Sequence, residues 1–278
     1  MAPGVTEDAP QTSGQPSPMS GVLTSSQATE KWTPQTVLST LPVRPQTHTA
    51  SPIPFFHMIE RLKTNKREGW RRFGLDHGES ISDHMYRMSI ITLLCPPSLS
   101  ARLDIARCTQ MALIHDMAES LVGDITPVDG VAKSEKSRRE AETMDYLCQE
   151  LLGKVYGGIN GQNIRAIWQE YEDGQTAESQ FVHDVDKVEL LLQMMEYERS
   201  GEGRRDLGEF SHVAGRIVLP EVQAWAAELL VERERFWSEH GKVPTGALEM
   251  SEERKRQQNE YYNGAHAVNG AVNGVKKA

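Results

Sequence analysis

Cysteine is scarce in this chain, and its three cysteines, Cys95, Cys108 and Cys148, are odd in number and show no CxxC spacing. Scattered thiols of this kind are typical of reduced core residues, and they build neither a disulfide framework nor a thiolate metal site. The chain also lacks an apolar run of about 18 residues, which a membrane-spanning helix would need. We therefore expect a protein of a reducing compartment with no membrane segment.

Positive charge is also in short supply, and the first basic residue of the chain is Lys31. Secretory and mitochondrial leaders begin with positive charge, so we predict a cytoplasmic location, with the nucleus as the alternative. Over the whole chain 39 acidic residues outnumber 30 basic ones, and the net charge is −9. This charge argues against binding of a nucleic-acid polymer, although a metal ion still allows a small anionic substrate.

The two ends of the chain lack a sustained apolar period. Residues 1–50 hold half of the fourteen prolines together with many Ser and Thr, and residues 244–278 have a charged patch followed by Asn, Gly and Ala. Such compositions bury too little apolar surface to become ordered. We predict a disordered N-terminal arm over 1–50, one folded domain over 51–243 and a disordered C-terminal tail over 244–278.

Between these tails, apolar residues recur with the spacing of amphipathic helices, and no stretch alternates as a half-buried strand does. Ser80 or Ser82 is a suitable N-cap for one helix, and Pro96-Pro97 ends it. The predicted fold class is all-α, a single-domain helical bundle. Its helices are expected at 53–63, 80–94, 103–122, 134–152, 163–171, 176–199 and 220–240.

Polar residues next to the most apolar segments are informative, because burying an unpaired polar group is costly. His115-Asp116 directly follows the apolar run 111–114, and Glu119 lies four residues after His115, on the same face of the expected helix. Asp124 follows Gly123 at the expected helix end, where its carboxylate can face the same cleft. The segment predicts an imidazole and several carboxylates in one place.

His84 and Asp186 occupy comparable positions on two other predicted helices. With His115 and Asp116 they supply two imidazoles and two carboxylates, a set that suits one hard or borderline divalent ion with open positions for water. Asp184, two residues before Asp186, is an alternative ligand. Such an ion would acidify a bound water, and Glu119 is a suitable general base to take its proton.

In combination, His84, His115-Asp116 and Asp186 resemble the H…HD…D signature of the HD superfamily of metal-dependent phosphohydrolases. The surrounding sequence is similar to one subfamily, the 5′-deoxynucleotidases. The similar segments are ESISDHMYRM at 79–88, HDMAESLVGDITP at 115–127 and DKVE at 186–189. The resemblance covers residues 51–240 and neither tail.

This resemblance implies an HD-type helical bundle, a homodimer, that hydrolyses deoxyribonucleoside 5′-monophosphates to deoxynucleoside and phosphate. It implies one divalent ion (Mn, Co, Mg, Fe or Zn) as cofactor. Glu119 matches the family's catalytic carboxylate, and Asp124 matches a second acid with a catalytic and substrate-binding role. Arg67 and Trp70 resemble the segment that meets the substrate. The implied metal ligands are His84, His115, Asp116 and Asp186.

Several alternatives stay open. Trp70 is equally well explained as a core residue, and His57 and His183 as surface residues or residues behind the ligands. The basic residues of the segment 133–139 form either a solvated helix face or a phosphate contact. A second functional hypothesis is an HD enzyme for another phosphoester, such as a cyclic nucleotide or a nucleoside triphosphate, and a third is a non-catalytic nucleotide-binding scaffold.

Overall fold

The computed structural model describes residues 31–244 and 256, and the rest of the predicted arm and tail lies outside this part of the chain. The described residues form helices and no strand, which confirms the all-α class. The helices are α1 (Pro34–Leu38), α2 (Ile53–Ile59), α3 (Arg61–Thr64), α4 (Glu68–Arg71), α5 (Ile81–Leu93), α6 (Pro97–Ser100), α7 (Ile105–Ile114), α8 (Glu119–Val122), α9 (Lys133–Asp145), η1 (Tyr146–Leu151), η2 (Val155–Gly158), α10 (Ile159–Asp173), α11 (Ala177–Ser200), η3 (Gly208–Arg216) and α12 (Pro220–Glu239).

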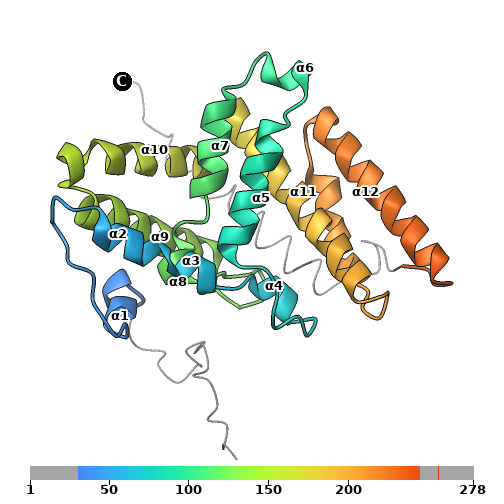
Figure 1. Cartoon of the computed structure of the whole chain (residues 1–278), viewed down its shortest axis with the longest axis horizontal. Helices are drawn as coiled ribbons and strands as arrows, with labels where there is room; N and C mark the ends of the chain where they lie inside the picture. The colour runs from blue at the N-terminus through green and yellow to red at the C-terminus, as the bar shows by residue number, and fades with distance from the viewer. Residues whose placement is uncertain (1–30, 245–255, 257–278) are drawn as a thin grey trace, which may run out of the picture. The chain divides into compact units, whose positions relative to one another are not determined.

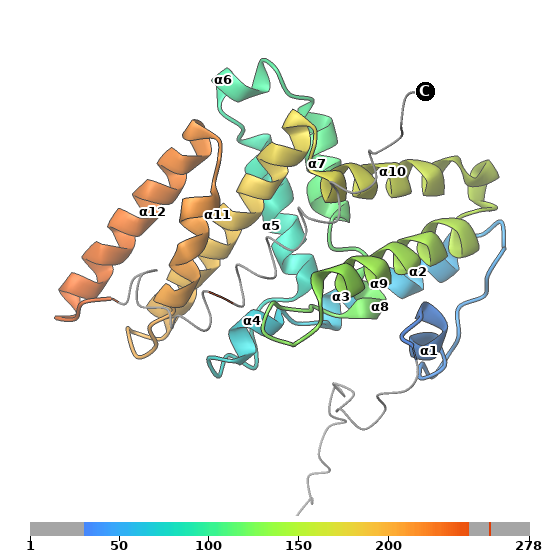
Figure 2. The ribbon, with the colours of Figure 1, turned by 180° about the vertical axis from the view of Figure 1, so that it is seen from behind.

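Three helices, α5, α7 and α11, meet at the centre of the bundle (Figure 1). In both views α12 lies along the side of α11 that faces away from α5, while α10 packs against α7 (Figures 1 and 2). Met88, Met111 and Leu191, one from each central helix, have no exposed surface. Their burial holds the three helices together, at roughly 1.5–3 kcal/mol for each fully buried side chain.

The start of α5 is defined by a capping box. The Ser80 hydroxyl accepts the backbone N–H of Asp83 at 3.1 Å, and the Asp83 carboxylate accepts the backbone N–H of Ser80 at 2.8 Å. These bonds satisfy amide groups that the first turn of a helix leaves without partners. Ser80, one of the two predicted N-caps, thus begins the helix, and His84 lies in its first turn.

Helix α12 is attached to α11 at both ends. Near its start, the buried carboxylate of Asp184 accepts the backbone N–H groups of Val218 and Leu219 at 3.0 and 2.8 Å. Near its other end, the carboxylate of Glu198 accepts two hydrogen bonds from Arg233, each at 2.9 Å. Both members of this ion pair are buried, so removing one alone would leave an uncompensated charge in the core.

The expected helix 103–122 is interrupted, and this corrects the sequence prediction. Helix α7 ends at Ile114, residues 115–118 form turns, and α8 begins at Glu119. The backbone N–H groups of Met117 and Glu119 donate to carbonyl oxygens three residues earlier, which is the tighter spacing of a 3₁₀ turn. Helix α8 then runs in a different direction from α7 (Figure 1). The i+4 relation of a continuous helix therefore does not describe how Glu119 reaches the site.

The N-terminal boundary of the folded domain also differs from the prediction. Helix α1 lies within the segment expected to be disordered, and the side chains of Thr33 and Thr36 form a capping box at its start. Leu38 at its end is 7% exposed and belongs to the hydrophobic core. Composition alone missed this helix, because a single buried leucine in a Pro-rich and Thr-rich segment gives no periodic signal.

Most other boundaries lie close to expectation. The predicted helix 53–63 is divided into α2 and α3, helix α9 passes directly into the π-helical η1, and α10 is longer than the predicted 163–171 at both ends.

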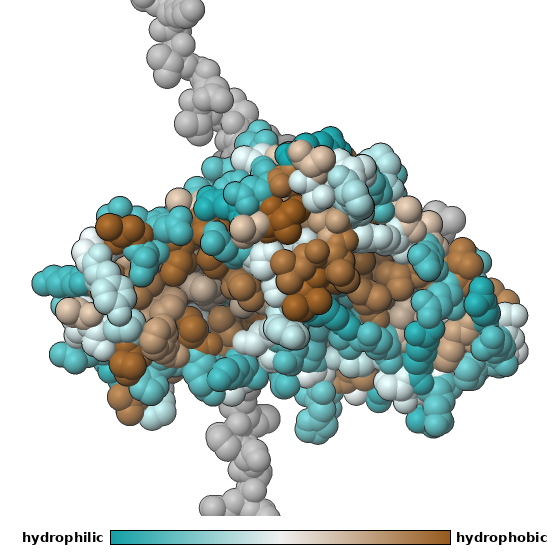
Figure 3. All heavy atoms as spheres, turned by 45° about the horizontal axis from the view of Figure 1, so that its top comes forward, coloured by the Kyte–Doolittle hydropathy of each residue, from teal (hydrophilic) through white to brown (hydrophobic). Residues whose placement is uncertain are grey.

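No helix among the described residues is long and apolar enough to cross a membrane. Apolar side chains do reach the surface in patches (Figure 3). Those of α5 are Tyr86, Ile90, Leu93 and the following Leu94.

Candidate metal centre and active site

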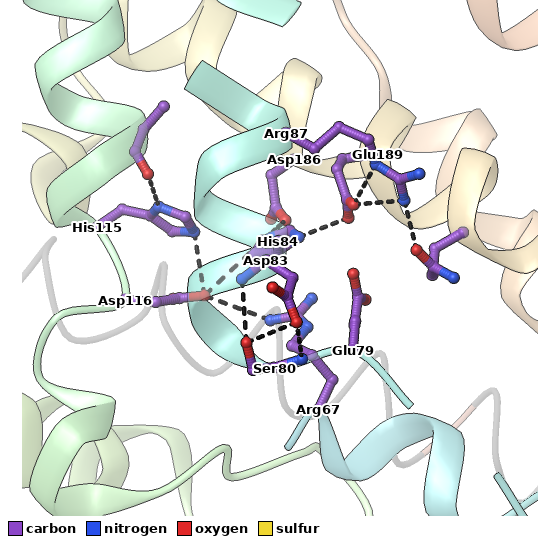
Figure 4. A network of polar contacts seen from close by, with 12 residues as sticks. Arg67, Glu79, Ser80, Asp83, His84, Arg87, His115, Asp116, Asp186 and Glu189 are labelled. Atoms are coloured by element: carbon purple, nitrogen blue, oxygen red, sulfur yellow. Dashed lines mark hydrogen bonds and ion pairs between the residues drawn. The ribbon is translucent and has the colours of Figure 1, made fainter. Parts of the chain in front are cut away.

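The four predicted ligands converge from three parts of the chain (Figure 4). His84 comes from the first turn of α5, His115 and Asp116 come from the turns after α7, and Asp186 comes from α11. Nε2 of His84 lies 3.2 Å from Oδ1 of Asp186 and 3.8 Å from Oδ2 of Asp116. Nε2 of His115 lies 3.1 Å from the same Asp116 oxygen. The helical bundle thus brings together residues that are far apart in the sequence.

These four side chains fit a bound metal ion. Nε2 of His84 and Nε2 of His115 are buried, and neither makes a hydrogen bond, although carboxylate oxygens lie 3.2 and 3.1 Å away. Buried nitrogens without partners are rare, because their desolvation is not compensated. Ligand atoms that share one ion, at bond lengths of about 2.1 Å, lie about 3 Å apart. The ligand atoms of His84, His115 and Asp186 all lie within 4.8 Å of one another, so they can share such an ion.

The other ring nitrogen of each histidine already has a partner. Nδ1 of His84 lies 2.5 Å from the buried carboxylate of Glu189, and Nδ1 of His115 lies 3.0 Å from the carbonyl oxygen of Ala112. Arg87 donates to the second oxygen of Glu189 at 2.8 Å (Figure 4). Partners of this kind orient an imidazole and leave its Nε2 for a metal. Glu189 was not among the predicted site residues, although its i+3 spacing from Asp186 was the available signal.

The electrostatics of the site favour a bound cation. Burial and Arg67 act to lower the pKa of His84, but the carboxylates of Glu189 and Asp186 outweigh them and raise it to about 10. Burial acts to raise the pKa of Asp186, but His84 and His115 outweigh burial and hold it well below its usual range. The carboxylates therefore attract positive charge into the space that the two imidazoles face, and a bound metal ion would supply it.

Asp184 and Asp186 have different surroundings, which separates the two candidate ligands on α11. Asp184 is fully buried, and both of its oxygens are engaged, one by the backbone before α12 and the other by Gln180 at 3.3 Å. Asp186 faces His84 instead (Figure 4). The geometry thus favours Asp186 over Asp184 as the ligand.

Glu119 lies at the start of α8 with 1% of its surface exposed. Its Oε1 is 3.7 Å from the ammonium group of Lys136, and its Oε2 is buried with no hydrogen-bond partner. Burial, together with Asp116 and Asp124, raises the pKa of Glu119 well above its usual value, against the opposing effect of Lys136. A carboxylate with a raised pKa and an unpartnered oxygen is suited to accept a proton.

The backbone around Glu119 is held by α3 and the residue after it. The side-chain amide of Asn65 donates to the carbonyl oxygen of Glu119 at 2.8 Å, and Nε of Arg61 donates to that of Ser120 at 2.5 Å. These contacts replace the support that a continuous helix would have given. Neither Asn65 nor Arg61 was predicted, because side chains that bind a distant backbone leave no pattern in the sequence.

Arg67 also reaches the cluster. Its guanidinium lies 3.3 Å from Oδ2 of Asp116 (Figure 4). Burial acts to lower the pKa of Arg67, but the surrounding carboxylates, Asp124 first among them, outweigh burial and raise it well above its usual value. Asp124 accepts the backbone N–H of Glu68 at 2.7 Å, and so holds the segment that carries Arg67. Both residues therefore lie at the site. The charge of Arg67 lies beside Asp116, and Asp124 holds the backbone next to Arg67.

Trp70, the other predicted substrate contact, lies in the core. It is 1% exposed, and its indole N–H donates to the carboxylate of Glu79 at 2.9 Å. Its ring packs against Tyr197 and Phe210, with centroid distances of 5.2 and 4.4 Å. This arrangement matches the core alternative for Trp70 and offers no open ring face to a substrate.

Aromatic rings support the candidate ligand His115 from behind. Tyr171 of α10 packs against His115 at a centroid distance of 4.9 Å, and His183 packs against Tyr171 at 4.0 Å. His183 therefore lies behind a ligand, as one alternative for it proposed, whereas His57 is exposed on α2. Tyr171 was not predicted, because an aromatic residue at helical spacing resembles any other core position.

The basic segment on α9 divides into two groups. Arg138 and Arg139 bind Glu135 of their own helix, with the shortest distances at 2.7 and 2.8 Å, which is the pattern of a solvated helix face. Lys136 lies beside Glu119 instead. A phosphate contact thus remains an alternative for the lysines of α9. It does not remain one for Arg138 and Arg139.

Comparison with known proteins gives the family. A family model described as HD domain matches residues 59–225, which include all four ligand positions. The chain is 44% identical over 187 residues to the 5′-deoxynucleotidase hdd1 of Schizosaccharomyces pombe, covering 67% of this chain and 92% of that protein. It is 37% identical over 180 residues to the 5′-deoxynucleotidase HDDC2 of Homo sapiens, covering 64% of this chain and 84% of the relative.

Solved structures agree with this result. The HD domain-containing protein YGK1 (YGL101W) matches with a TM-score of 0.53 and 31% identity, covering 74% of this chain and 100% of that one. The PH0347 protein of Pyrococcus horikoshii OT3 matches with a TM-score of 0.51 and 28% identity, covering 66% of this chain and 99% of that one. The family model spans more than half of the sequence and includes the converging histidines and aspartates, so this chain belongs to the HD domain family.

Proposed function

We propose that this protein is a metal-dependent 5′-deoxynucleotidase, which hydrolyses deoxyribonucleoside 5′-monophosphates to deoxynucleoside and phosphate. One observation carries the chemistry: two buried imidazole Nε2 atoms without hydrogen-bond partners face the carboxylates of Asp116 and Asp186. The substrate class is supported by relatives named 5′-deoxynucleotidase, which are 37–44% identical to this chain.

A divalent ion held by His84, His115, Asp116 and Asp186 would neutralise phosphoryl charge and acidify a bound water. Glu119 would accept the proton of that water through Oε2, its oxygen without a partner. The water oxygen would form a bond to phosphorus as the bond from phosphorus to O5′ breaks, and O5′ would leave with the proton that Glu119 had taken up.

A phosphate monoester carries two negative charges at neutral pH, so the site must also supply fixed positive charge. The guanidinium of Arg67, beside Asp116, is suited to bind a phosphoryl oxygen of the substrate. Asp124 supports the Arg67 segment, and its predicted contact with the nucleotide remains part of this proposal. The predicted homodimer is also part of this proposal.

Phosphate release by the purified protein tests this function. The protein is first treated with a chelator and then supplied with Mn²⁺, Co²⁺, Mg²⁺, Fe²⁺ or Zn²⁺, and the substrates include dAMP, AMP, a cyclic nucleotide and dATP. We expect activity only after metal addition and faster hydrolysis of dAMP than of AMP. Equal rates on AMP and dAMP would indicate a general nucleotidase, and a preference for the cyclic nucleotide or for dATP would contradict the proposal.

A further inference from the structure

Lys136 lies on the face of α9 that is directed toward α8 and the candidate active site. Its ammonium nitrogen is 3.7 Å from Oε1 of Glu119 and 3.5 Å from Oε1 of Glu140, which is one turn further along α9. Both carboxylates are buried, whereas the Lys136 side chain is 21% exposed. The ammonium group thus lies between two buried acids, at the edge of the interior.

Glu119 requires such a cation more than an ordinary surface acid does. It is buried at 1% exposure in a site that already contains the carboxylates of Asp116 and Asp186. Burying a carboxylate beside others of the same charge is costly unless an opposite charge lies nearby. Lys136 supplies that charge to Oε1, and Oε2 is left without a hydrogen-bond partner.

Glu140 gives the lysine a fixed position. Because Glu140 is four residues after Lys136, the two side chains project from the same face of α9. The cation is therefore held from its own helix on one side and contacts Glu119 on the other. Arg138, only two residues away, projects differently and binds Glu135 and Glu142 of its own helix at 2.7 and 2.6 Å.

We propose that Lys136 is a positioning residue for the hydrolysis reaction, which holds the Glu119 carboxylate by its Oε1 so that Oε2 is presented to the attacking water. Lys136 acts through Glu119 and does not itself bind the phosphate. This inference rests on the proposed function, in which Glu119 is the general base. Positioning of Glu119 by Lys136 differs from both alternatives given above for this basic segment, a solvated helix face and a phosphate contact.

A double-mutant cycle tests the inference. The variants are Lys136→Met, Lys136→Arg, Glu119→Gln and the combination of Lys136→Met with Glu119→Gln, and Arg138→Met is the matched control on the same helix. Each is assayed for kcat and KM on dAMP and for metal content by elemental analysis. We expect Lys136→Met to lower kcat by about 10–100-fold with KM changed less than about threefold, and Lys136→Arg to recover part of the loss.

The combined variant gives the decisive comparison. If Lys136 acts through Glu119, its removal has no further effect once Glu119 is Gln, so the combined variant should match Glu119→Gln within about twofold. Metal content and the kcat of Arg138→Met should equal those of the wild type. A large rise in KM, or a multiplicative loss in the combined variant, would indicate direct phosphate binding and overturn the inference.

Thermal unfolding of the metal-free protein gives a readout that does not depend on activity. Lys136→Met should lower Tm by about 2–4 °C, because it leaves buried Glu119 and Glu140 without their cation, and the shift should be smaller in the Glu119→Gln background, where Glu140 alone loses its partner. An equal Tm shift in both backgrounds contradicts the contact. A wild-type protein that hydrolyses no nucleotide would instead reject the proposed function, and the Tm cycle would still test the contact itself.

Discussion

Asp184 and Asp186 are separated by a single residue on α11, yet the structure gives them different tasks. Asp184 attaches the backbone before α12, whereas Asp186 faces His84 in the candidate metal centre. Both are acidic residues of the same helix, so an identical substitution at the two positions separates support of the fold from metal binding.

Asp186→Asn should lose most of the bound metal, because it removes the charge of one ligand, and should keep the fold. Asp184→Asn should keep the metal, but it should destabilise the protein by about 1–3 kcal/mol, because an amide group replaces an acceptor of two backbone N–H groups. Elemental analysis and urea unfolding of both variants measure the two effects. Retained metal in Asp186→Asn, together with metal loss in Asp184→Asn, would reverse the assignment of the ligand.

His183 is predicted to make stability depend on pH. Burial and the nearby charge of Lys187 lower its pKa to about 4, and its Nε2 lies 3.0 Å from the carbonyl oxygen of Tyr171. The unfolded chain binds a proton at His183 below about pH 6.5, whereas the folded protein does so only below about pH 4. Stability from this residue is therefore complete above about pH 6.5 and is lost as the pH falls toward 4, by up to about 3 kcal/mol.

His183→Gln removes this titration and keeps an N–H donor for Tyr171. The free energy of unfolding of the variant should fall less steeply between pH 6.5 and 4 than that of the wild type, by about one proton in the slope. Urea unfolding at several pH values, in the same metal-free buffer, measures both slopes. His57→Gln, at an exposed position of α2, is the control substitution. Parallel curves for His183→Gln and wild type would show that folding does not lower the pKa of His183.

At the scale of helices, two features decide the position of Glu119, the proposed general base. The turns between α7 and α8 redirect the chain after His115, and α3 holds the backbone of α8 through Asn65 and Arg61. Helix α1 adds a third support, since it packs against both α8 and α9. The segment whose composition predicts disorder thus borders the helix that carries Glu119.

Leu38→Ala should show the contribution of α1. The side chain is 7% exposed, and replacing a buried leucine by alanine costs about 2–5 kcal/mol through lost burial and the cavity left behind. Gln35→Ala, an exposed position on the same helix, should change the free energy of unfolding by less than about 0.5 kcal/mol. Urea unfolding of the two variants measures the difference. Equal stabilities would mean that α1 does not dock on the domain in solution.

At the scale of the whole molecule, the candidate metal centre lies where the three central helices meet. Its candidate ligands come from α5, the end of α7 and α11, so a bound ion would connect all three elements, in addition to their packing and the contacts of Glu189 with His84 and Arg87. An ion that binds only the folded state stabilises it according to its concentration and affinity. The metal should therefore contribute to stability as well as to chemistry.

Addition of Mn²⁺ at about 100 times its Kd should stabilise the metal-free protein by about 2.7 kcal/mol, and raise Tm by about 5–10 °C for a domain of this size. His84→Gln should not respond, because it lacks a ligand from the central helix α5. Differential scanning fluorimetry over a metal titration measures both proteins, with Arg138→Met as a variant that keeps the response. A normal shift in His84→Gln would place the stabilising ion elsewhere. The predicted homodimer is measured on the same samples by light scattering.

The all-α class, most helix boundaries and the family follow from the amino-acid sequence, because these depend on apolar period, capping residues and short local motifs. An N-cap at Ser80 or Ser82 and the candidate ligands His84, His115 and Asp116 follow from such local patterns, which left Asp186 and Asp184 as alternatives. The tertiary structure alone decided what depends on contacts between distant segments. It separated Asp186 from Asp184, placed Trp70 in the core, attached α1 to the domain and brought Lys136 to Glu119. A local pattern records which face a side chain takes on its own helix, and only the packing of helices determines which partner that face meets.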